Sequence, residues 1–353
     1  MYRDNLVGVV VPAYNEAGLI GDVIRTMPTF VDHVYVVDDA STDETLEEAA
    51  DAARESDVMT PAVTIDQRQS VVSDGGSDPL AARAGLYDRI GRVVLLRHEE
   101  NRGAGGAIKT GYLAAIQDEN DVVVTMDGDG QMDPEHMPKL LDPIVDGVAD
   151  YAKGNRLLYK DYRQAMPKFR FFGNSILTGL TKIASGYWKT MDPQNGYTAI
   201  SSHALENLGV EGIYEYYGYC NDVLVKLNAK GMDVADVAIP AVYGDEESSI
   251  NYSAYIWNVS GMLLRNFLWR LKVKYLVLDF HPLALFYILG ALTTGLGVAG
   301  TFWSFYAAFA LGESLFVRAS LSAMLVIFGS MFLLFAMLFD MQVNEDREVQ
   351  VYE

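Results

Sequence analysis

Two carboxylates follow a short apolar run in the first half of the chain. Residues Val122–Met126 are β-branched or apolar, and they lead into Asp127, Gly128 and Asp129, with Gln131 two residues later. Such a segment could be a polar turn, because Asp-Gly turns are common. It is a poor match to a calcium loop, since the fifth and sixth positions hold Gln and Met. Mg²⁺ and Mn²⁺ bind a few protein oxygens together with phosphate oxygens. We therefore favour a metal site formed by Asp127, Asp129 and Gln131.

A second pair of carboxylates, Asp38 and Asp39, follows the apolar run Val34–Val37. A side chain from this segment, such as Ser41 or Asp43, could cap the helix that follows. One cap requires only one carboxylate. The second carboxylate could accept a hydrogen bond from a nucleobase N–H or a ribose hydroxyl.

A glycine-rich segment, Asn-Arg-Gly-Ala-Gly-Gly-Ala, covers residues 101–107. Backbone N–H groups at such a strand-to-helix turn can bind phosphate. The spacing matches neither of the two common nucleotide-binding glycine motifs. Close backbone packing at the start of a helix explains the glycines equally well.

These motifs need a scaffold that brings them together. Short apolar runs at residues 6–11, 34–37, 93–96 and 122–126 are typical of strands that are buried on both faces. Helical stretches are expected at residues 16–27, 43–55 and 104–118. This alternation predicts an α/β fold with a mostly parallel sheet, whose strands end at a common ligand-binding edge. Residues 57–90 combine Pro, Gly-Gly and scattered charge, so we expect a solvent-exposed, partly disordered insertion.

The C-terminal part has a different character. Residues 282–311 and 319–339 contain no charged residue, and each run is long enough to cross a bilayer core of roughly 30 Å. A short turn separates the runs, so we expect a transmembrane hairpin rather than two buried core helices. The preceding segment, residues 251–280, mixes basic and large apolar residues and resembles an amphipathic helix at the headgroups.

Basic residues predict the orientation of the hairpin. Four precede the first run and one lies near the turn: Arg265, Arg270, Lys272, Lys274 and Arg318 respectively. The positive-inside rule places the N-terminal part and the acidic tail, residues 341–353, in the cytoplasm. We expect no cleavable signal peptide, because the N-terminus has no cationic region followed by a long apolar stretch.

The chain is strongly acidic, with 47 Asp and Glu against 27 Lys and Arg. Nearly all of the excess lies in residues 1–262, which carry 40 acidic and 21 basic residues. Nucleic acid is therefore not an expected partner. Such a surface suits a salt-loving source, because molar salt shortens the Debye length to about 3 Å. The single cysteine, Cys220, excludes an internal disulfide and a cysteine-based zinc cluster.

Four segments together resemble the inverting glycosyltransferases of family 2, which have the GT-A fold. They are Val-Pro-Ala-Tyr-Asn-Glu, Asp-Asp-Ala-Ser-Thr-Asp-Glu-Thr, the glycine-rich turn, and Met-Asp-Gly-Asp-Gly-Gln. Within that family the chain is most similar to polyprenol- and dolichyl-phosphate mannose or glucose synthases, of a halophilic archaeal kind. The resemblance covers about residues 5 to 250, which would form the catalytic domain (1–250), followed by the juxtamembrane segment, two transmembrane helices (281–340) and the tail.

The resemblance implies roles for individual residues. A nucleoside or nucleotide-sugar site would contain Pro12, Tyr14, Glu16, Asp39, Asp127 and Gly128. Mg²⁺ or Mn²⁺ would be held by Asp127, Asp129 and Gln131. Arg156 would face the phosphates or the acceptor, Asp192 and Gly196 would lie near the donor sugar, and Arg170 and Ser175 would bind the acceptor phosphate. Asp129, Arg156 and Asp192 are thus catalytic candidates.

The chain departs from the family pattern after its last expected strand. A basic element with Gly-x-Ser-Lys is common there, whereas residues 242–252 match it only at Ser248. We expect transfer of a hexose from a UDP- or GDP-sugar to polyprenyl phosphate at the cytoplasmic membrane face. An alternative is transfer to a hydroxyl of a lipid-linked saccharide or polysaccharide, with Asp222 as general base. A third possibility is a non-catalytic sugar-binding protein. Such a protein would not need the acidic motifs, so their presence here argues against it.

Overall fold

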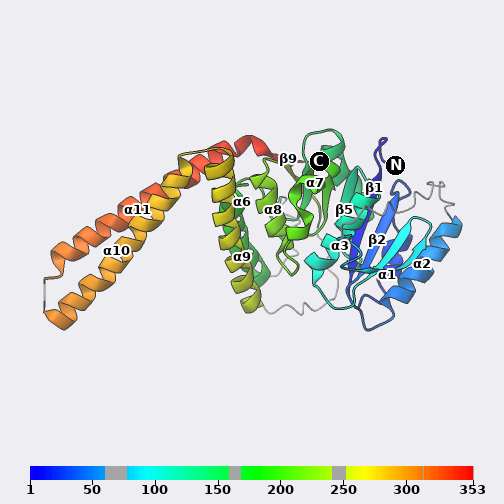
Figure 1. Ribbon diagram of the computed structural model, residues 1–353, viewed down its shortest axis with the longest axis horizontal. Coiled ribbons are helices and arrows are strands. Elements are labelled where there is room, and N and C mark those ends of the chain that lie inside the picture. The colour runs from blue at the N-terminus through cyan, green and yellow to red at the C-terminus, as the bar shows by residue number, and fades with distance from the viewer. Residues whose placement is uncertain (60–77, 159–167, 241–251, 313, 353) are drawn as a thin grey trace.

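The computed structural model describes residues 1–59, 78–158, 168–240, 252–312 and 314–352 (Figure 1). One mixed sheet has the order β3-β4-β2-β1-β5-β7-β6-β8-β9. Its strands are β1 (Val7–Ala13), β2 (His33–Asp38), β3 (Gly85–Ile90), β4 (Val93–Arg97), β5 (Val122–Thr125), β6 (Tyr151–Asn155), β7 (Thr198–Ser201), β8 (Val234–Ala238) and β9 (Glu348–Val351).

Helices cover both faces of the sheet and continue into a long projection (Figure 1). Around the sheet are α1 (Ile20–Arg25), α2 (Thr45–Met59), α3 (Ala104–Gln117), α4 (Met137–Val145), α7 (Ser202–Leu208) and α8 (Tyr219–Ala229). The helices toward the projection are α6 (Lys168–Ser185), α9 (Tyr252–Lys272), α10 (Leu283–Leu311) and α11 (Phe316–Val343). The predicted α/β class and the predicted C-terminal pair of apolar helices are confirmed.

The central strands are apolar because both faces of the sheet are buried. Along β1, Val9 and Val11 pack into one hydrophobic core and Val10 packs into the other. β1 pairs in parallel with β2 on one side and with β5 on the other. A continuous apolar run, rather than an alternating one, is the pattern that such a strand requires.

The predicted insertion is shorter than residues 57–90. Helix α2 continues to Met59, and residues 85–90 form the edge strand β3, antiparallel to β4. Residues 60–77 lie outside the described part of the chain. The strand was missed because its side chains are largely exposed, which removes the apolar signal that identifies a buried strand.

The acidic tail expected at residues 341–353 is not separate from the rest of the structure. After α11 the chain returns to the sheet, where β9 pairs in parallel with β8 (Figure 1). Asn344, between α11 and β9, is fully buried and donates to the carboxylate of Asp340. The sheet therefore includes residues on both sides of the hairpin in sequence.

Helices α10 and α11 each have the length and apolar composition needed to span a membrane. They pack closely through small residues: a Cβ added to Gly329 would lie 2.4 Å from the backbone N of Thr294. Small residues at such contacts allow two helix backbones to approach. Large apolar side chains such as Phe302 and Phe328 are exposed on the outside of the pair.

The basic segment before the hairpin is only partly a surface feature. Lys272 and Arg265 are exposed, but Arg270 is fully buried and pairs with Asp340 of α11 at 2.7 Å. Lys274 donates to Asn344 at 2.6 Å. Two of the four basic residues that predicted the orientation thus have internal partners, which the sequence pattern did not reveal.

Candidate active site

Strands β1 and β5 are neighbours near the centre of the sheet, and the order of the strands along the chain reverses between them. From β1 the order runs to β2 and β4 on one side and to β5 on the other, so the crevice between β1 and β5 is a topological switch point. Pro12, near the end of β1, lies close to Gly128, which follows β5. A Cβ on Gly128 would lie 3.0 Å from the Pro12 carbonyl oxygen. Glycine at this position therefore allows the two strand ends to approach.

Asp127 and Asp129 follow β5, at this switch point. Both are partly buried. Burial raises the pKa of Asp127 to about 7, repulsion from Asp129 adds to the increase, and the positive charge of Arg156 opposes it. The Gln131 backbone N–H donates to Asp129 at 2.9 Å. Two neighbouring carboxylates of this kind are stabilised by a cation.

The donor set fits a hard divalent ion. Carboxylate and amide oxygens are the ligands that Mg²⁺ and Mn²⁺ favour. The described residues contain no group of three or more His, Cys, Asp and Glu that could hold a metal by itself. Asp127, Asp129 and Gln131 would therefore supply part of a coordination shell, and a bound diphosphate and water would supply the remainder.

The loops after β1 and β2 are joined to each other. The Asn15 backbone N–H donates to the Ser41 hydroxyl at 2.9 Å, and the Asn15 side chain accepts from the Thr42 N–H at 2.9 Å. The Glu16 N–H donates to Thr45 at 2.8 Å. Tyr14, directly before Asn15 in this loop, is 47% exposed. An exposed ring on a fixed loop can stack on a nucleobase.

Asp43 performs the capping role that was one of two interpretations of its segment. Its carboxylate accepts from the Thr45 N–H at 3.1 Å, at the start of α2. Asp38 is fully buried, its Oδ1 accepts from the Ser41 N–H, and Arg97 lies 3.4 Å from its Oδ2. Asp38, the last residue of β2, thus binds Ser41 and Arg97 and does not cap α2.

Asp39 fixes the glycine-rich turn. Its carboxylate accepts from the N–H groups of Arg102 and Gly103, both at 2.8 Å, and contacts His98 at 2.6 Å. His98 in turn contacts Thr110 on α3 at 2.8 Å. Asp39 is 3% exposed. Through these contacts Asp39 holds the glycine-rich turn in place, next to the loops after β1 and β2.

The glycines of the turn serve close packing. A Cβ on Gly105 would lie 2.3 Å from the Tyr214 carbonyl oxygen, and the Gly106 N–H donates to the Glu215 carbonyl. The side chain of Glu215 pairs with Arg83 at 2.8 Å and with Lys109 at 2.6 Å. Of the two interpretations of this segment, these contacts support packing over a phosphate cradle.

Arg156 and Asp192 form a two-pronged ion pair beside the carboxylates. Arg156 follows β6, and its Nε and Nη2 donate to Asp192 at 2.7 and 2.9 Å. Burial opposes ionisation of Asp192, but Arg156 holds its pKa below the usual value. Asp192 is fully buried, so it positions Arg156. The same loop reaches Gly196, where a Cβ would lie 3.4 Å from Asp127 Oδ2.

The predicted acceptor residues lie on a different element. Arg170 and Ser175 belong to α6, which packs against α8 and α9 through Leu177 and Ala184. Ser175 is exposed. Ser248, the partial match to the basic element, lies outside the described residues. The helix that carries the acceptor candidates thus adjoins the segment that leads to the hairpin (Figure 1).

Asp222 does not have the environment of a general base. It is 1% exposed, and its carboxylate accepts from the Tyr214 N–H at 2.8 Å and from Asn266 at 2.5 Å. It also pairs with Lys226. A base needs to reach the proton that it removes. Asp222 instead connects α8 to α9 and to the segment beside the glycine-rich turn.

A buried ion pair behind the site was not predicted. Lys153 on β6 and Asp236 on β8 lie opposite each other in register and are joined at 2.7 Å. Asp236 also accepts from the Met191 N–H at 3.0 Å, next to Asp192. A sequence signal existed: each of these two short apolar strands contains one charged residue of opposite sign.

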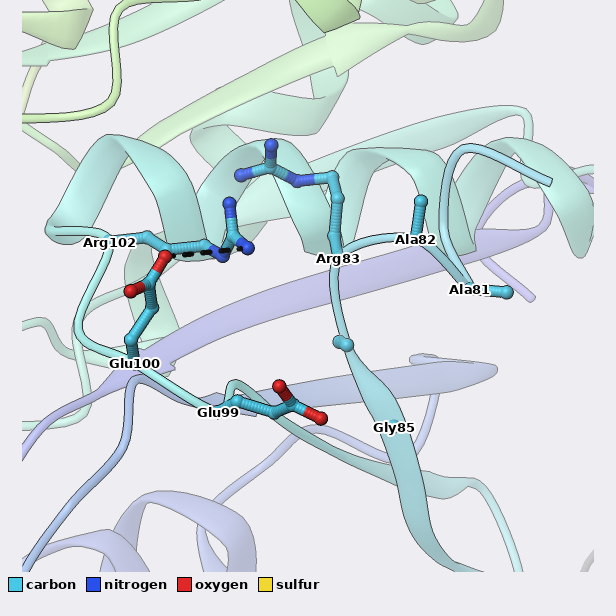
Figure 2. A pocket seen from close by; sticks show the side chains of 8 residues that line it. Ala81, Ala82, Arg83, Gly85, Glu99, Glu100 and Arg102 are labelled. Atoms are coloured by element: carbon cyan, nitrogen blue, oxygen red, sulfur yellow. Dashed lines mark ion pairs between the residues drawn. The ribbon is translucent and has the colours of Figure 1, made fainter. Parts of the chain in front are cut away.

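A pocket of about 500 Å³ lies beyond the glycine-rich turn (Figure 2). Figure 2 shows Arg83 and Arg102 extended toward each other next to α3, with Glu100 paired with Arg102. The pocket is lined by Ala81, Ala82, Arg83, Ala84, Gly85, Glu99, Glu100 and Arg102. None of the predicted site residues lines it, so this pocket is separate from the carboxylate pair after β5.

Comparisons with known proteins identify the family. The model of glycosyl transferase family 2 matches residues 8–69 and 62–209, more than half of the chain. The chain is 28% identical, over 68% of its length and 87% of the relative, to UDP-N-acetylglucosamine--dolichyl-phosphate N-acetylglucosaminyltransferase of Methanococcus voltae. It is 23% identical to glycosyltransferase AglJ of Haloferax volcanii, over 99% of this chain and 97% of the relative.

Among solved structures, the chain is similar to glucosyl-3-phosphoglycerate synthase from Mycobacterium tuberculosis in complex with UDP. The identity is 20%, the match covers 76% of this chain and 81% of that chain, and the TM-score is 0.49.

Proposed function

The chain belongs to glycosyl transferase family 2 and is a glycosyltransferase, and from that premise we propose that it transfers a hexose from a UDP- or GDP-sugar to a polyprenyl phosphate. The observation that carries the proposal is the carboxylate pair, Asp127 and Asp129, at the switch point between β1 and β5. The name of the Methanococcus voltae relative, a dolichyl-phosphate transferase, supports the acceptor class.

The reaction is a displacement at the anomeric carbon. An acceptor phosphate oxygen forms a bond to this carbon while the bond to the donor diphosphate breaks, and the bonding electrons leave with the nucleoside diphosphate. A bound Mg²⁺ or Mn²⁺ would neutralise the charge of the departing diphosphate. Asp127, Asp129 and Gln131 would hold that ion. Arg156, fixed by Asp192, would present its guanidinium to the phosphates.

The remaining site residues would bind the two substrates. On the donor side, Tyr14 would stack on the base, and Pro12 and Glu16 would line the nucleoside site that Asp39 helps to shape. On the acceptor side, Arg170 and Ser175 of α6 would hold the lipid phosphate. The uncharged run of α11 is roughly 30 Å long, enough to cross the bilayer core. The hairpin would therefore place α6, which adjoins the segment leading to it, near the cytoplasmic membrane surface.

A phosphate acceptor needs no general base, which agrees with the buried, fully engaged state of Asp222. A monoalkyl phosphate has a second pKa near 6, so it is largely dianionic at neutral pH and attacks without losing a proton. A sugar hydroxyl would need a base, and removing that base would cost on the order of 10²–10⁴ in rate. The contacts of Asp222 with Lys226, Asn266 and Tyr214 favour the phosphate over the hydroxyl acceptor.

The metal part of the proposal is tested with Asp129→Asn. We expect transfer of radiolabel from UDP- and GDP-sugars to dolichyl phosphate to fall at least a hundredfold, while the melting temperature stays within a few degrees. EDTA should stop the wild-type enzyme, and Mn²⁺ or Mg²⁺ should restore it. Full activity in EDTA would rule out the metal role.

The acceptor part is tested with two variants under saturating donor. Arg170→Ala should raise the KM for dolichyl phosphate strongly, because it removes a positive charge that binds the phosphate. Asp222→Asn, if folded, should retain much of its kcat. A thousandfold loss of kcat in folded Asp222→Asn, beside a nearly normal Arg170→Ala, would favour the hydroxyl acceptor.

A further inference from the structure

The chain that follows the hairpin contacts the loop that carries Asp192. Glu348, the first residue of β9, is 7% exposed and lies against residues 188–190. Its Oε1 accepts from the Trp188 N–H at 2.6 Å, and its Oε2 accepts from the N–H groups of Lys189 at 2.8 Å and Thr190 at 2.7 Å. The Thr190 hydroxyl also donates to Oε2, at 3.0 Å. One carboxylate thus binds three consecutive backbone amides.

From this anchor the loop leads directly to the candidate active site. Met191 is held next, because its N–H donates to Asp236 and its carbonyl accepts from Lys153. Asp192 follows with a left-handed backbone, φ 48°, and grips Arg156. A left-handed conformation is unfavourable for a non-glycine residue and persists only where the surroundings impose it. The fixed segment before Asp192 supplies that constraint.

The far end of the same loop lies against the carboxylate pair. Gly196 approaches Asp127 so closely that a Cβ there would lie 3.4 Å from its Oδ2. Arg156 is also close enough to Asp127 for the two opposite charges to attract each other. Displacement of residues 188–190 would therefore move both the guanidinium and the backbone that border the candidate diphosphate site.

The position of Glu348 depends on the hairpin. β9 begins five residues after α11, which ends at Val343. Between them, buried Asn344 accepts from Asn228 of α8 at 2.9 Å and from Lys274 at 2.6 Å. β9 then pairs with β8, placing Glu348 opposite Val234. The strand edge and the end of the second apolar helix together determine where the carboxylate lies.

We propose that Glu348 is a positioning residue for sugar transfer: through residues 188–190 it holds the loop that aligns Arg156 with the carboxylate pair, so that the segment beyond the hairpin completes the active site. The inference rests on the proposed function, and it adds a residue that the acidic tail was not expected to supply. Glu348 itself does not touch the reacting atoms. Its effect passes through the backbone of the loop and the Asp192–Arg156 pair.

The test uses the full-length protein in detergent and three variants. Glu348→Gln keeps the size of the side chain but removes its charge and replaces one acceptor oxygen with a donor. Thr190→Val removes only the hydroxyl donor on the loop side of the contact. Glu345→Gln is the control, because it lies on the same segment and its side chain is 61% exposed, 3.8 Å from Lys189. The substitution keeps the backbone carbonyl that accepts from Lys189.

Hydrogen exchange is measured first, because it does not depend on activity. We expect the amides of residues 188–192 to exchange at least tenfold faster in Glu348→Gln, with a smaller increase in Thr190→Val and no change in Glu345→Gln. Amides of β1 and β5 should keep their wild-type rates. Unchanged exchange of the loop in both Glu348→Gln and Thr190→Val would overturn the proposal, and Thr190→Val alone decides if Glu348→Gln does not fold.

Kinetics then separates positioning from simple loss of folded protein. Calorimetric binding of UDP or GDP with Mn²⁺ counts the folded molecules and reports affinity. For Glu348→Gln we expect unchanged stoichiometry, because folded molecules still bind the nucleotide through the contacts near Tyr14. We expect a higher dissociation constant, because Arg156 is no longer held in place beside the diphosphate. At the same time kcat per binding site should fall at least tenfold. An unchanged kcat beside accelerated loop exchange would refute the catalytic part.

Failure of the proposed function gives a different result. If the wild-type protein transfers no sugar from any tested donor to dolichyl phosphate, the function is wrong, while the exchange rates still decide whether Glu348 holds the loop. If the wild type is active and Glu348→Gln matches it in both measurements, only the positioning role is wrong.

Discussion

Breaking the buried pair between Arg270 and Asp340 should separate the hairpin from the catalytic fold. Both side chains are fully buried, and the guanidinium donates to Asp340 Oδ2 at 2.7 Å and Oδ1 at 3.0 Å. Arg270 also donates to the Ala184 carbonyl of α6 at 2.8 Å. Asp340 accepts from the Tyr275 hydroxyl at 2.7 Å. The pair thus joins α9, α6 and α11 in one polar cluster surrounded by apolar residues.

The magnitude follows from the cost of leaving one charge alone. Removing one partner of a buried ion pair destabilises a protein by about 3–5 kcal/mol, because the other charge stays desolvated without compensation. We therefore expect Asp340→Leu or Arg270→Met to lower the melting temperature by on the order of 6 to 15 °C. Replacing both residues removes both buried charges. The double variant should be more stable than either single variant, since apolar substitutes for a buried pair are often nearly neutral.

The assay is thermal unfolding of purified full-length protein in one detergent, followed by tryptophan fluorescence. Asp51→Asn serves as the control, because its pair with Arg54 is exposed on both sides, at 72% and 58%. Exposed pairs contribute at most about 1 kcal/mol. If the single variants at Arg270 and Asp340 melt like the control, the cluster does not hold the hairpin. If the losses in the two single variants add up in the double variant, the charges are not coupled.

Three further predictions address the packing, the chemistry and the topology. Gly105→Ala should destabilise the fold by about 1–3 kcal/mol, because its Cβ would lie 2.3 Å from a backbone oxygen, whereas Gly179→Ala on α6 has open space and should be neutral or stabilising; equal melting temperatures would contradict this. Asp192→Asn should lower kcat at least tenfold by weakening its grip on Arg156, and wild-type kcat in a folded variant would exclude the positioning role. A reporter fused to either chain end should be active only in the cytoplasm, and activity only outside the cell would exclude the hairpin orientation.

Local sequence patterns were sufficient to predict the central strands, the two long apolar helices and the edge of the sheet where ligands are expected to bind. Continuous apolar runs predict β1, β2, β4 and β5 because a strand that is buried on both faces cannot place polar side chains on either. Long uncharged runs predict α10 and α11 for the same reason, with the bilayer in place of a protein core. The acidic motifs were expected to converge, since parallel strands end at one edge.

Sequence could not tell which polar residues face a ligand and which face other parts of the protein. We expected Asp222 as a general base and Asp39 at the nucleoside site. In the structure Asp222 contacts Lys226 and Asn266, and Asp39 accepts from the backbone of the glycine-rich turn. The partners lie 4 to 64 residues away. The sequence around a carboxylate does not identify most of the hydrogen-bond donors that it meets, because donors such as Asn266 and the Arg102 N–H are distant in sequence.

The C-terminal segment shows the difference most clearly. A short, charged stretch after two apolar helices has the composition of a solvated tail, and the alternation Glu-Val-Gln-Val covers only four residues, too few to identify β9 as a strand. It becomes a strand because β8 presents an unpaired edge and because the buried residues of α9 and α11 bring the chain back to that edge. Backbone pairing with a distant strand is independent of side-chain pattern, so it was determined only when the tertiary structure placed the two segments together.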